Sequence, residues 1–253
     1  MGARVNRILF EPEEVTDGRV TFGGVRAAHV VEILHGEAGQ TLKTGIVDGP
    51  IGTSVIERVT PVPGGYEVTV RTDHAELSLA PWVDLVLAPP RPRVLKRLLP
   101  QLAALGVGRI VLVGAKKVEK DFWGATLLKA ENYRPLLVDG LMQAGTSALP
   151  RLETRRNFGR FLDEELDALL PSPRRIVAHP YGAGDGAGAA LAPRDGSERL
   201  TVAIGPEGGW TDEEVARLET HGFVRRSLGR RILRTDTATV AMLAQLMMTE
   251  DRA

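Results

Sequence analysis

The sequence predicts an α/β protein in two parts, a small N-terminal β-barrel and a larger domain in which helices cover a mainly parallel sheet. Two observations lead to this prediction. Residues 1–75 contain short strand-like stretches separated by turn residues, whereas residues 76–253 alternate between apolar strand-like runs and segments with helical periodicity. Strands that alternate with helices are typical of a parallel sheet covered by helices.

The first 75 residues are expected to form the barrel. Residues 66–71 alternate apolar and polar side chains, as a strand with one buried face does. Residues 40–47 end at Asp48-Gly49, and Pro63-Gly64-Gly65 precedes the strand at 66–71, so both boundaries carry turn signals. One helix is predicted over 27–34. Several short strands with one helix favour a small barrel.

The second part is expected to carry the function. Ligands bind open parallel sheets outside the carboxyl ends of the strands, so the loops after residues 178, 204 and 228 are the places to search. The predicted strands are 82–88, 109–113, 175–178, 200–204 and 224–228, and the predicted helices are 93–105, 127–144, 212–221 and 237–249.

Composition excludes several kinds of chemistry. The chain has 253 residues, 43% hydrophobic and 25% charged, which is ordinary for a globular protein of the cytoplasm. It shows neither a transmembrane run nor a secretory signal, so no membrane partner is expected. The lack of cysteine excludes disulfides, Cys-ligated zinc and thiol catalysis. His29, His35 and His74 have no metal-ligand partners at suitable spacing, so no metal is expected.

The net charge is zero, but the charge is unevenly distributed. Basic residues clearly outnumber acidic residues over 91–134, while acidic residues dominate residues 1–80. A local basic stretch can bind phosphate in a neutral protein. Solvated helix faces account for the same stretch equally well.

The loop after residue 178 contains a relaxed dinucleotide-binding pattern. Residues 184–189, Gly-Asp-Gly-Ala-Gly-Ala, fit G-x-G-x-x-A. That motif requires a helix that begins directly at the glycines, and Pro193 follows too soon. A flexible loop is therefore favoured over a nicotinamide-dependent enzyme.

The loop after residue 204 has a more specific composition. Residues 204–210, Ile-Gly-Pro-Glu-Gly-Gly-Trp, leave an apolar strand and lead to a helix whose start, Thr211-x-x-Glu214, is a capping box. Glycines let a ligand approach the bare backbone, whose N–H groups bind polar or anionic groups. No Lys-Ser/Thr pair follows, so this is not a triphosphate-binding loop. A tight structural turn alone accounts poorly for Pro-Glu-Gly-Gly.

The third loop combines cations with apolar side chains. Residues 228–238, Leu-Gly-Arg-Arg-Ile-Leu-Arg-Thr-Asp-Thr-Ala, lie between a strand and a helix and supply several possible N-caps. A basic surface turn with a helix cap is the simpler interpretation. It leaves Ile232-Leu233 unexplained, because two apolar residues inside a loop indicate that something planar and apolar packs there.

Together with His179-Pro180, these two loops resemble the RsmE family of 16S rRNA uridine-N3 methyltransferases, in the SPOUT superfamily. The resemblance covers nearly the whole chain. It implies a PUA-like barrel over 1–75 that binds RNA, and a methyltransferase domain over 76–253 with a deep trefoil knot. It also implies S-adenosylmethionine as cofactor, 16S rRNA or the small ribosomal subunit as partner, and a homodimer.

The resemblance assigns roles to particular residues. Arg234 is expected to be catalytic, because an arginine can stabilise negative charge that develops on the uracil ring. The expected RNA contacts are Arg4, Arg7, Arg26, Arg91, Arg93 and Lys96. The expected cofactor contacts are His179, Pro180, Gly205, Pro206, Glu207, Gly208, Gly209, Leu228, Gly229, Leu233 and Thr237.

The last predicted helix is unusually apolar, which favours a homodimer packed partly through it over burial in the protein's own core. Its apolar residues are Val240, Ala241, Leu243, Ala244, Met247 and Met248.

Other positions depart from the family pattern and leave the target nucleotide open. They are Gln101, Ala104, Met142 and Thr146. A SPOUT methyltransferase that acts on another RNA site and a catalytically silent ribosome-assembly factor are therefore the alternatives.

Overall fold

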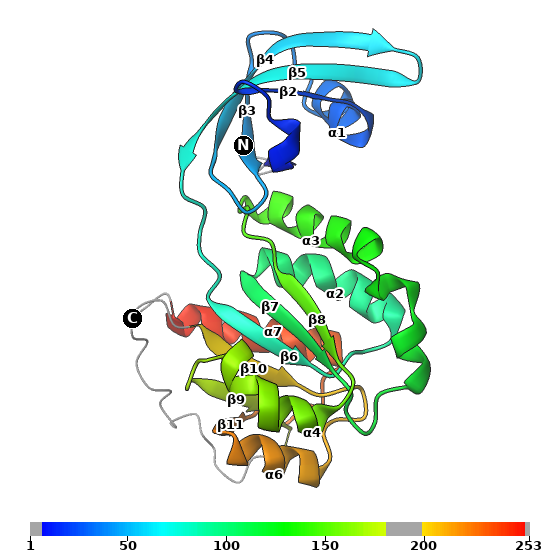
Figure 1. Ribbon diagram of the computed structural model, residues 1–253, viewed down its shortest axis with the longest axis vertical. Helices are drawn as coiled ribbons and strands as arrows, with labels where there is room; N and C mark the ends of the chain where they lie inside the picture. The colour runs from blue at the N-terminus through cyan, green and yellow to red at the C-terminus, as the bar shows by residue number, and fades with distance from the viewer. Residues whose placement is uncertain (1–6, 181–198, 251–253) are drawn as a thin grey trace. The chain divides into compact units, whose positions relative to one another are not determined.

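The protein divides into two compact units, seen in a computed structural model that describes residues 7–180 and 199–250 (Figure 1). Unit 1 comprises Met1–Ala80 and Val138–Leu149, and unit 2 comprises Pro81–Leu137 and Pro150–Ala253. The return of residues 138–149 to unit 1 has no signal in the sequence, because those residues continue a helical pattern that begins in unit 2.

Unit 1 contains a curled five-stranded mixed sheet in the order β1-β3-β4-β5-β2. Strand β1 is parallel to β3 and the remaining neighbours are antiparallel. Within the described residues the edge strands β1 and β2 do not pair, so the small barrel that the sequence predicts is present as a half-barrel. The strands are β1 (Ile8–Phe10), β2 (Arg19–Phe22), β3 (Thr41–Ile46), β4 (Ile51–Val62) and β5 (Gly65–Glu76).

The concave side of this sheet holds an apolar core. Phe10 and Phe22 pack against each other at 5.3 Å between ring centroids, and Val68 and Val70 of β5 are fully buried beside them. Ala27 and Val30 complete the core from a helical segment that starts three residues earlier than predicted. That segment is α1 (Gly24–Ala28) followed by the π-helical turn η2 (His29–Ile33), and a short 3₁₀ turn, η1 (Pro12–Glu14), precedes them.

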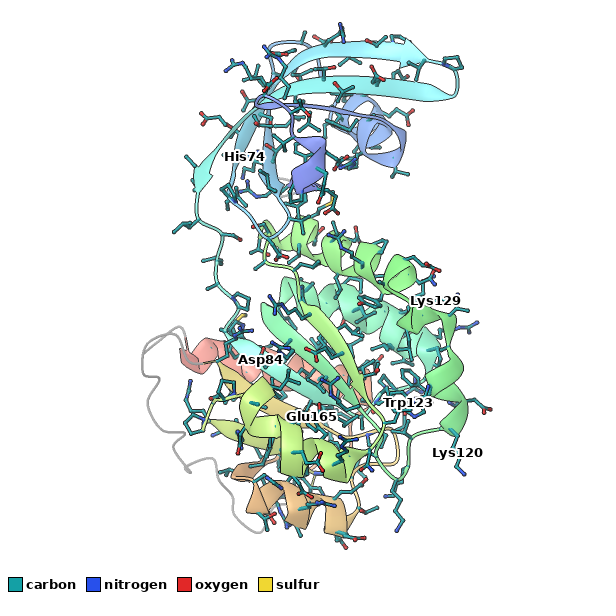
Figure 2. All side chains as sticks on the ribbon, in the orientation of Figure 1. His74, Asp84, Lys120, Trp123, Lys129 and Glu165 are labelled. Carbon is teal, nitrogen blue, oxygen red and sulfur yellow. The ribbon has the colours of Figure 1, made fainter. Side chains whose placement is uncertain are left out.

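A buried polar cluster joins β3, β4 and β5. Thr44 Oγ1 lies 2.6 Å from Ser54 Oγ and 2.7 Å from Nε2 of His74, which Figure 2 labels in unit 1. Burial lowers the pKa of His74, and the nearby Arg7 guanidinium lowers it further. His74 therefore takes part in a hydrogen-bonded cluster that stabilises the sheet.

Unit 2 contains a six-stranded sheet in the order β11-β9-β10-β6-β7-β8, and all neighbouring strands are parallel. Every residue of β6 and of β10 is buried, which explains why both strands are mostly apolar, with Asp84 and Thr201 as their polar residues. The strands are β6 (Val83–Leu87), β7 (Val107–Val113), β8 (Arg151–Arg155), β9 (Arg175–Ala178), β10 (Leu200–Ile204) and β11 (Phe223–Arg226).

Helices cover both faces of this sheet (Figure 1). On one face α2 (Pro92–Ala104) packs against α7 (Thr235–Glu250). On the other face a core that includes Phe158, Phe161 and Trp210 joins the sheet to α6 (Asp212–Thr220) and to the segment before β9. That segment consists of α4 (Phe158–Arg160), η5 (Phe161–Glu165) and α5 (Leu166–Leu169), and the β7–β8 connection consists of η3 (Lys120–Gly124), η4 (Thr126–Leu128) and α3 (Ala130–Ala144).

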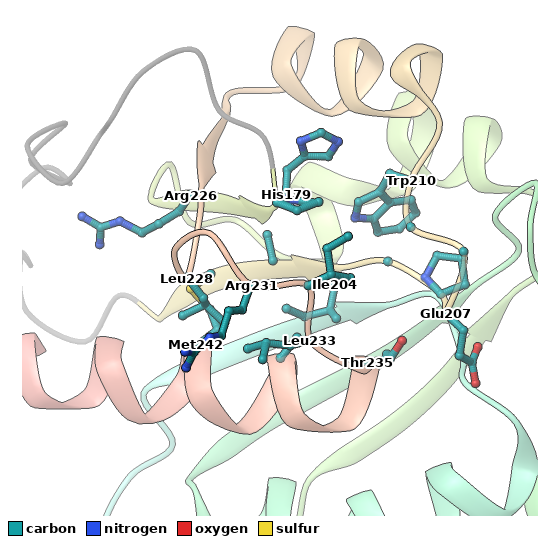
Figure 3. A pocket seen from close by; sticks show the side chains of 18 of the residues that line it. His179, Ile204, Glu207, Trp210, Arg226, Leu228, Arg231, Leu233, Thr235 and Met242 are labelled. Carbon is teal, nitrogen blue, oxygen red and sulfur yellow. The ribbon is translucent and has the colours of Figure 1, made fainter.

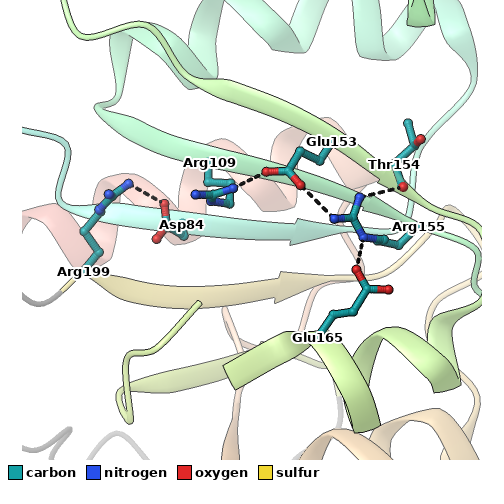
Figure 4. A network of polar contacts seen from close by, with 7 residues as sticks. All are labelled: Asp84, Arg109, Glu153, Thr154, Arg155, Glu165 and Arg199. Atoms are coloured by element: carbon teal, nitrogen blue, oxygen red, sulfur yellow. Dashed lines mark hydrogen bonds and ion pairs between the residues drawn. The ribbon is translucent and has the colours of Figure 1, made fainter. Parts of the chain in front are cut away.

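A ladder of ion pairs crosses the sheet (Figure 4). Arg199 donates to the buried carboxylate of Asp84 at 2.9 Å. Burial raises the pKa of Asp84, although Arg199 and Arg109 oppose this effect. The ladder continues from Arg109 to Glu153, and from there to Arg155 and Glu165.

Because Gly114 has no side chain, the end of β7 can lie close to the chain after β8. A Cβ atom on this residue would lie 1.9 Å from the carbonyl oxygen of Arg156, which is backbone and cannot move independently. We predict that Gly114→Ala lowers the free energy of unfolding by about 1–3 kcal/mol, the usual scale for overpacking, measured by urea denaturation. Gly124→Ala is the control, because no atom lies within 4 Å of its Cβ position. Equal stability of the two variants would show that the close approach at Gly114 imposes no constraint on the fold.

Candidate functional site

A cavity of about 470 Å³ lies in unit 2 at the carboxyl ends of the parallel strands β9, β10 and β11 (Figure 3). Its walls come from residues 178–180, from the turn after β10, and from the loop between β11 and α7. All of the sequence-predicted cofactor residues except Thr237 line it. Three loops that are distant in sequence therefore meet at one edge of the sheet.

The turn after β10 brings bare backbone to the cavity. The Gly209 N–H donates to the Pro206 carbonyl at 2.8 Å, and Gly209 has a φ of +68°, a conformation that side-chain-bearing residues rarely adopt. A Cβ on Gly205 would lie 3.0 Å from the backbone nitrogen of Trp210. Both glycines are therefore required by the shape of the turn.

Two neighbouring loops hold this turn in place. The Arg91 N–H, at the start of α2, donates to Glu207 Oε1 at 3.0 Å. The Lys117 ammonium donates to the Gly208 carbonyl at 2.7 Å, and Lys117 also lines the cavity. Sequence reasoning missed Lys117, although it follows β7 at the same edge of the sheet and the rule about strand ends would have pointed to its loop.

The loop after β11 is tied to the end of β9. The His179 N–H donates to the Arg226 carbonyl at 3.0 Å. Ser227 Oγ accepts from the Gly229 N–H at 3.1 Å and lies 3.3 Å from the Pro180 carbonyl. These contacts place residues 226–229 across the cavity from the glycine turn.

Apolar side chains continue the lining beyond Gly229. Ile232 is 75% exposed and Leu233 is 37% exposed, and both line the cavity together with Leu228. Exposed aliphatic side chains at the wall of a cavity suit a ligand with an apolar face.

The start of α7 decides which of its residues face the cavity. The helix begins at Thr235, and Thr235, Ala238 and Met242 line the cavity because they share one helical face. Thr237 lies on another face and is exposed. Arg234 has an exposed side chain and does not line the cavity itself, but it lies between Leu233 and Thr235, which do.

The sequence-predicted RNA contacts in unit 2 are on α2 and at its start. Arg93 and Lys96 are exposed, and within residues 7–180 and 199–250 neither has an ion-pair partner. Arg91 is also exposed and pairs with Glu119 at 3.1 Å.

The sequence-predicted RNA contacts in unit 1 are engaged inside that unit. Arg7 donates to the carbonyls of Thr44, Gly52 and Gly145, at 2.6, 2.8 and 3.1 Å. Arg26 pairs with Glu14 and lies over the rings of Phe10 and Phe22. These contacts use both guanidinium groups to hold unit 1 together, a role that the sequence did not indicate. Arg4 lies outside the described residues.

The remaining sequence-based expectations concern a dinucleotide-binding loop, metal binding and membrane insertion. The glycine-rich pattern at 184–189 lies outside the described residues. Among the residues that the structure describes, no group of three or more His, Cys, Asp or Glu could hold a metal ion. None of the helices in that part of the chain is long and apolar enough to cross a membrane.

The fold and the cavity define a class of protein. Residues 78–247 match the family model described as RNA methyltransferase domain, so the protein is an RNA methyltransferase by class. The chain is 32% identical over 249 residues to a ribosomal RNA small subunit methyltransferase E of Treponema pallidum, covering 96% of this chain and 91% of the relative. The chain belongs to the ribosomal RNA small subunit methyltransferase E family, RsmE, and the sequence-based resemblance is confirmed.

Solved structures share this fold over nearly the whole chain. A Legionella pneumophila protein solved with bound S-adenosylmethionine superimposes with a TM-score of 0.76 at 24% identity, covering 98% of both chains. A ribosomal RNA small subunit methyltransferase E of Neisseria gonorrhoeae, also bound to S-adenosylmethionine, superimposes with a TM-score of 0.74 at 20% identity. The latter comparison covers 97% of this chain and 98% of the other.

Proposed function

We propose that this protein transfers a methyl group from S-adenosylmethionine to N3 of a uridine in 16S rRNA of the small ribosomal subunit, in the cytoplasm. The observation that carries the proposal is the cavity at the ends of β9, β10 and β11 in a chain of the RsmE family. The Treponema pallidum relative is named for methylation of small-subunit ribosomal RNA, and two proteins of the same fold bind S-adenosylmethionine.

The residues of the cavity fit this cofactor. The glycine turn offers backbone groups without side chains, Leu228 and Leu233 offer apolar contacts, and the buried Nε1 of Trp210 has no hydrogen-bond partner among the described residues. When bound, S-adenosylmethionine supplies an electrophilic methyl group on a sulfonium centre. We propose that the cofactor contacts are the sequence-predicted set, His179, Pro180, Gly205, Pro206, Glu207, Gly208, Gly209, Leu228, Gly229 and Leu233, with Thr235 in place of Thr237.

The acceptor imposes a requirement on the protein. N3 of uridine is a weakly acidic imide, which must lose its proton to solvent as the N–C bond forms and the bond between methyl and sulfur breaks, leaving its electron pair on sulfur. Negative charge develops on the base oxygens as the proton leaves. Arg234, beside the cavity wall, is the proposed group that stabilises this charge.

We also propose how RNA reaches the site. Arg93 and Lys96 on α2, with Arg91 at its start, would contact phosphate, and unit 1 would act as a PUA-like RNA-binding module whose shape Arg7 and Arg26 maintain. The RsmE family also supports a deep trefoil knot in the part of the chain that forms the cavity. Gln101 and Ala104, which depart from the family pattern, are exposed on α2.

Methylation of isolated small-subunit RNA tests the proposed function. The protein should transfer labelled methyl from S-adenosylmethionine to one uridine, located by mass spectrometry of nuclease fragments. Leu233→Asp places a carboxylate in the apolar wall and should abolish cofactor binding, measured by calorimetry, while Val224→Asp, at an exposed position away from the cavity, should not. Methylation of another nucleotide would favour the alternative substrate, and cofactor binding without transfer would favour a silent assembly factor.

Arg234→Ala should slow methyl transfer by about a hundredfold or more, the usual scale for the loss of one group that stabilises developing charge. Cofactor affinity should change little, because the Arg234 side chain does not line the cavity. Lysine should rescue the rate only partly, since it lacks the planar guanidinium. Single-turnover kinetics at saturating RNA measure the effect, with Arg230→Ala as an exposed control in the same loop. An unchanged rate for Arg234→Ala would exclude this role.

We further propose a homodimer packed through α7. Leu243 is fully buried within unit 2, whereas Met248 is 59% exposed. Light scattering should give the mass of a dimer for the wild type and of a monomer for Ala244→Glu, with Ala216→Glu on the exposed face of α6 as control. A monomeric wild type at micromolar concentration would contradict the proposal. The partly exposed apolar residues of α7 are Val240, Ala241, Ala244 and Met247.

A further inference from the structure

Trp210 combines a rigid position with an unused hydrogen-bond donor. Its side chain is only 5% exposed and stacks on Phe158, with 5.3 Å between ring centroids and 26° between the ring planes. This stack fixes the orientation of the indole. Its Nε1 is buried and has no hydrogen-bond partner within residues 7–180 and 199–250.

Trp82 is a second indole whose N–H does have a partner inside the protein. The Nε1 of Trp82 donates to the Leu105 carbonyl at 2.7 Å. Buried donors in native proteins nearly always have a partner, because an unpaired N–H has lost its bond to water and gained nothing in return. The unpaired N–H of Trp210 therefore calls for an explanation that Trp82 does not need.

The position of Trp210 at the cavity can explain why its N–H has no partner inside the protein. Trp210 lines the cavity at the ends of β9, β10 and β11, as do Ile204 and His179 (Figure 3). A Cβ on Gly205 would lie 3.2 Å from Trp210 Nε1 and 3.1 Å from Cδ1. Since residue 205 is glycine, no side chain separates the N–H edge of the indole from the turn that forms the cavity wall.

We propose that Trp210 is a cofactor-binding residue whose Nε1–H donates a hydrogen bond to an acceptor atom of S-adenosylmethionine. This inference rests on the proposed function. The cofactor offers acceptors in both halves, ring nitrogens and hydroxyl oxygens in the adenosyl half and a carboxylate in the methionyl half. A rigid donor in a largely apolar cavity fixes the orientation of the ligand.

Trp210→Phe tests the inference, because phenylalanine keeps an aromatic ring against Phe158 and removes only the donor and part of the ring. The dissociation constant for S-adenosylmethionine, measured by calorimetry, should rise about tenfold, as expected for one lost hydrogen bond in a buried site. The melting temperature of the ligand-free protein should fall only by the packing lost with part of the ring, since the donor that is removed has no partner in the protein. The rise in melting temperature on addition of cofactor should shrink.

Trp82→Phe is the matched control. It removes an indole N–H that already has a partner in the protein, so it should lower the melting temperature of the ligand-free protein and leave cofactor affinity unchanged. If Trp210→Phe, like Trp82→Phe, leaves cofactor affinity unchanged, the N–H of Trp210 does not bind the cofactor and the inference is wrong. If the wild type itself does not bind the cofactor, the proposed function fails instead, so the two failures are distinguishable.

5′-Methylthioadenosine, which lacks the methionyl carboxylate, locates the acceptor. A loss of affinity in Trp210→Phe for both ligands supports an acceptor in the adenosyl half. A loss of affinity for S-adenosylmethionine alone supports the methionyl carboxylate as the acceptor. Unchanged affinity for both ligands would overturn the inference.

Discussion

The candidate site depends on the parallel pairing of β9 with β10 and with β11. Because these strands run in the same direction, their carboxyl ends meet at one edge, and the three segments that follow them must surround the same space. The bond from the His179 N–H to the Arg226 carbonyl extends this pairing one step beyond the strands. If that pairing were lost, the glycine turn and the arginine-rich loop would no longer face each other.

The site also depends on contacts that hold the glycine turn in its conformation, because the turn makes few interactions of its own. Gly205 and Gly209 remove side chains where the backbone must pass close to Trp210 or adopt a positive φ. Three of the five residues 205–209 are glycines, so the turn has little side-chain packing of its own. Hydrogen bonds from the Arg91 N–H to Glu207 and from the Lys117 ammonium to the Gly208 carbonyl hold the turn in place. Arg91 follows β6 and Lys117 follows β7. The wall of the cavity is thus maintained partly by contacts from the segments that follow β6 and β7.

Sequence patterns predicted elements best where burial is complete. The strands β6 and β10 are buried on both faces, so four of the five residues in each are apolar and both strands are easily identified. Strand β8 was missed because it is partly exposed and carries Glu153 and Arg155 for the ion-pair ladder. The helical segment at 158–169 was missed because a π-helical turn interrupts its period. In unit 1, closure of the sheet depends on whether distant edge strands meet, which local alternation does not encode.

The sequence by itself determined the family and the location of the site, because the glycine turn and the 228–238 loop are contiguous motifs whose composition is difficult to explain by folding alone. The tertiary structure decided which neighbours complete the cavity. Lys117 and Trp210 reach it through packing, Thr235 replaces Thr237 because the first turn of α7 sets the helical phase, and Arg7 turns inward toward carbonyl groups. Each of these outcomes depends on contacts between residues far apart in the chain, and periodicity and motif spacing describe only residues that are close together.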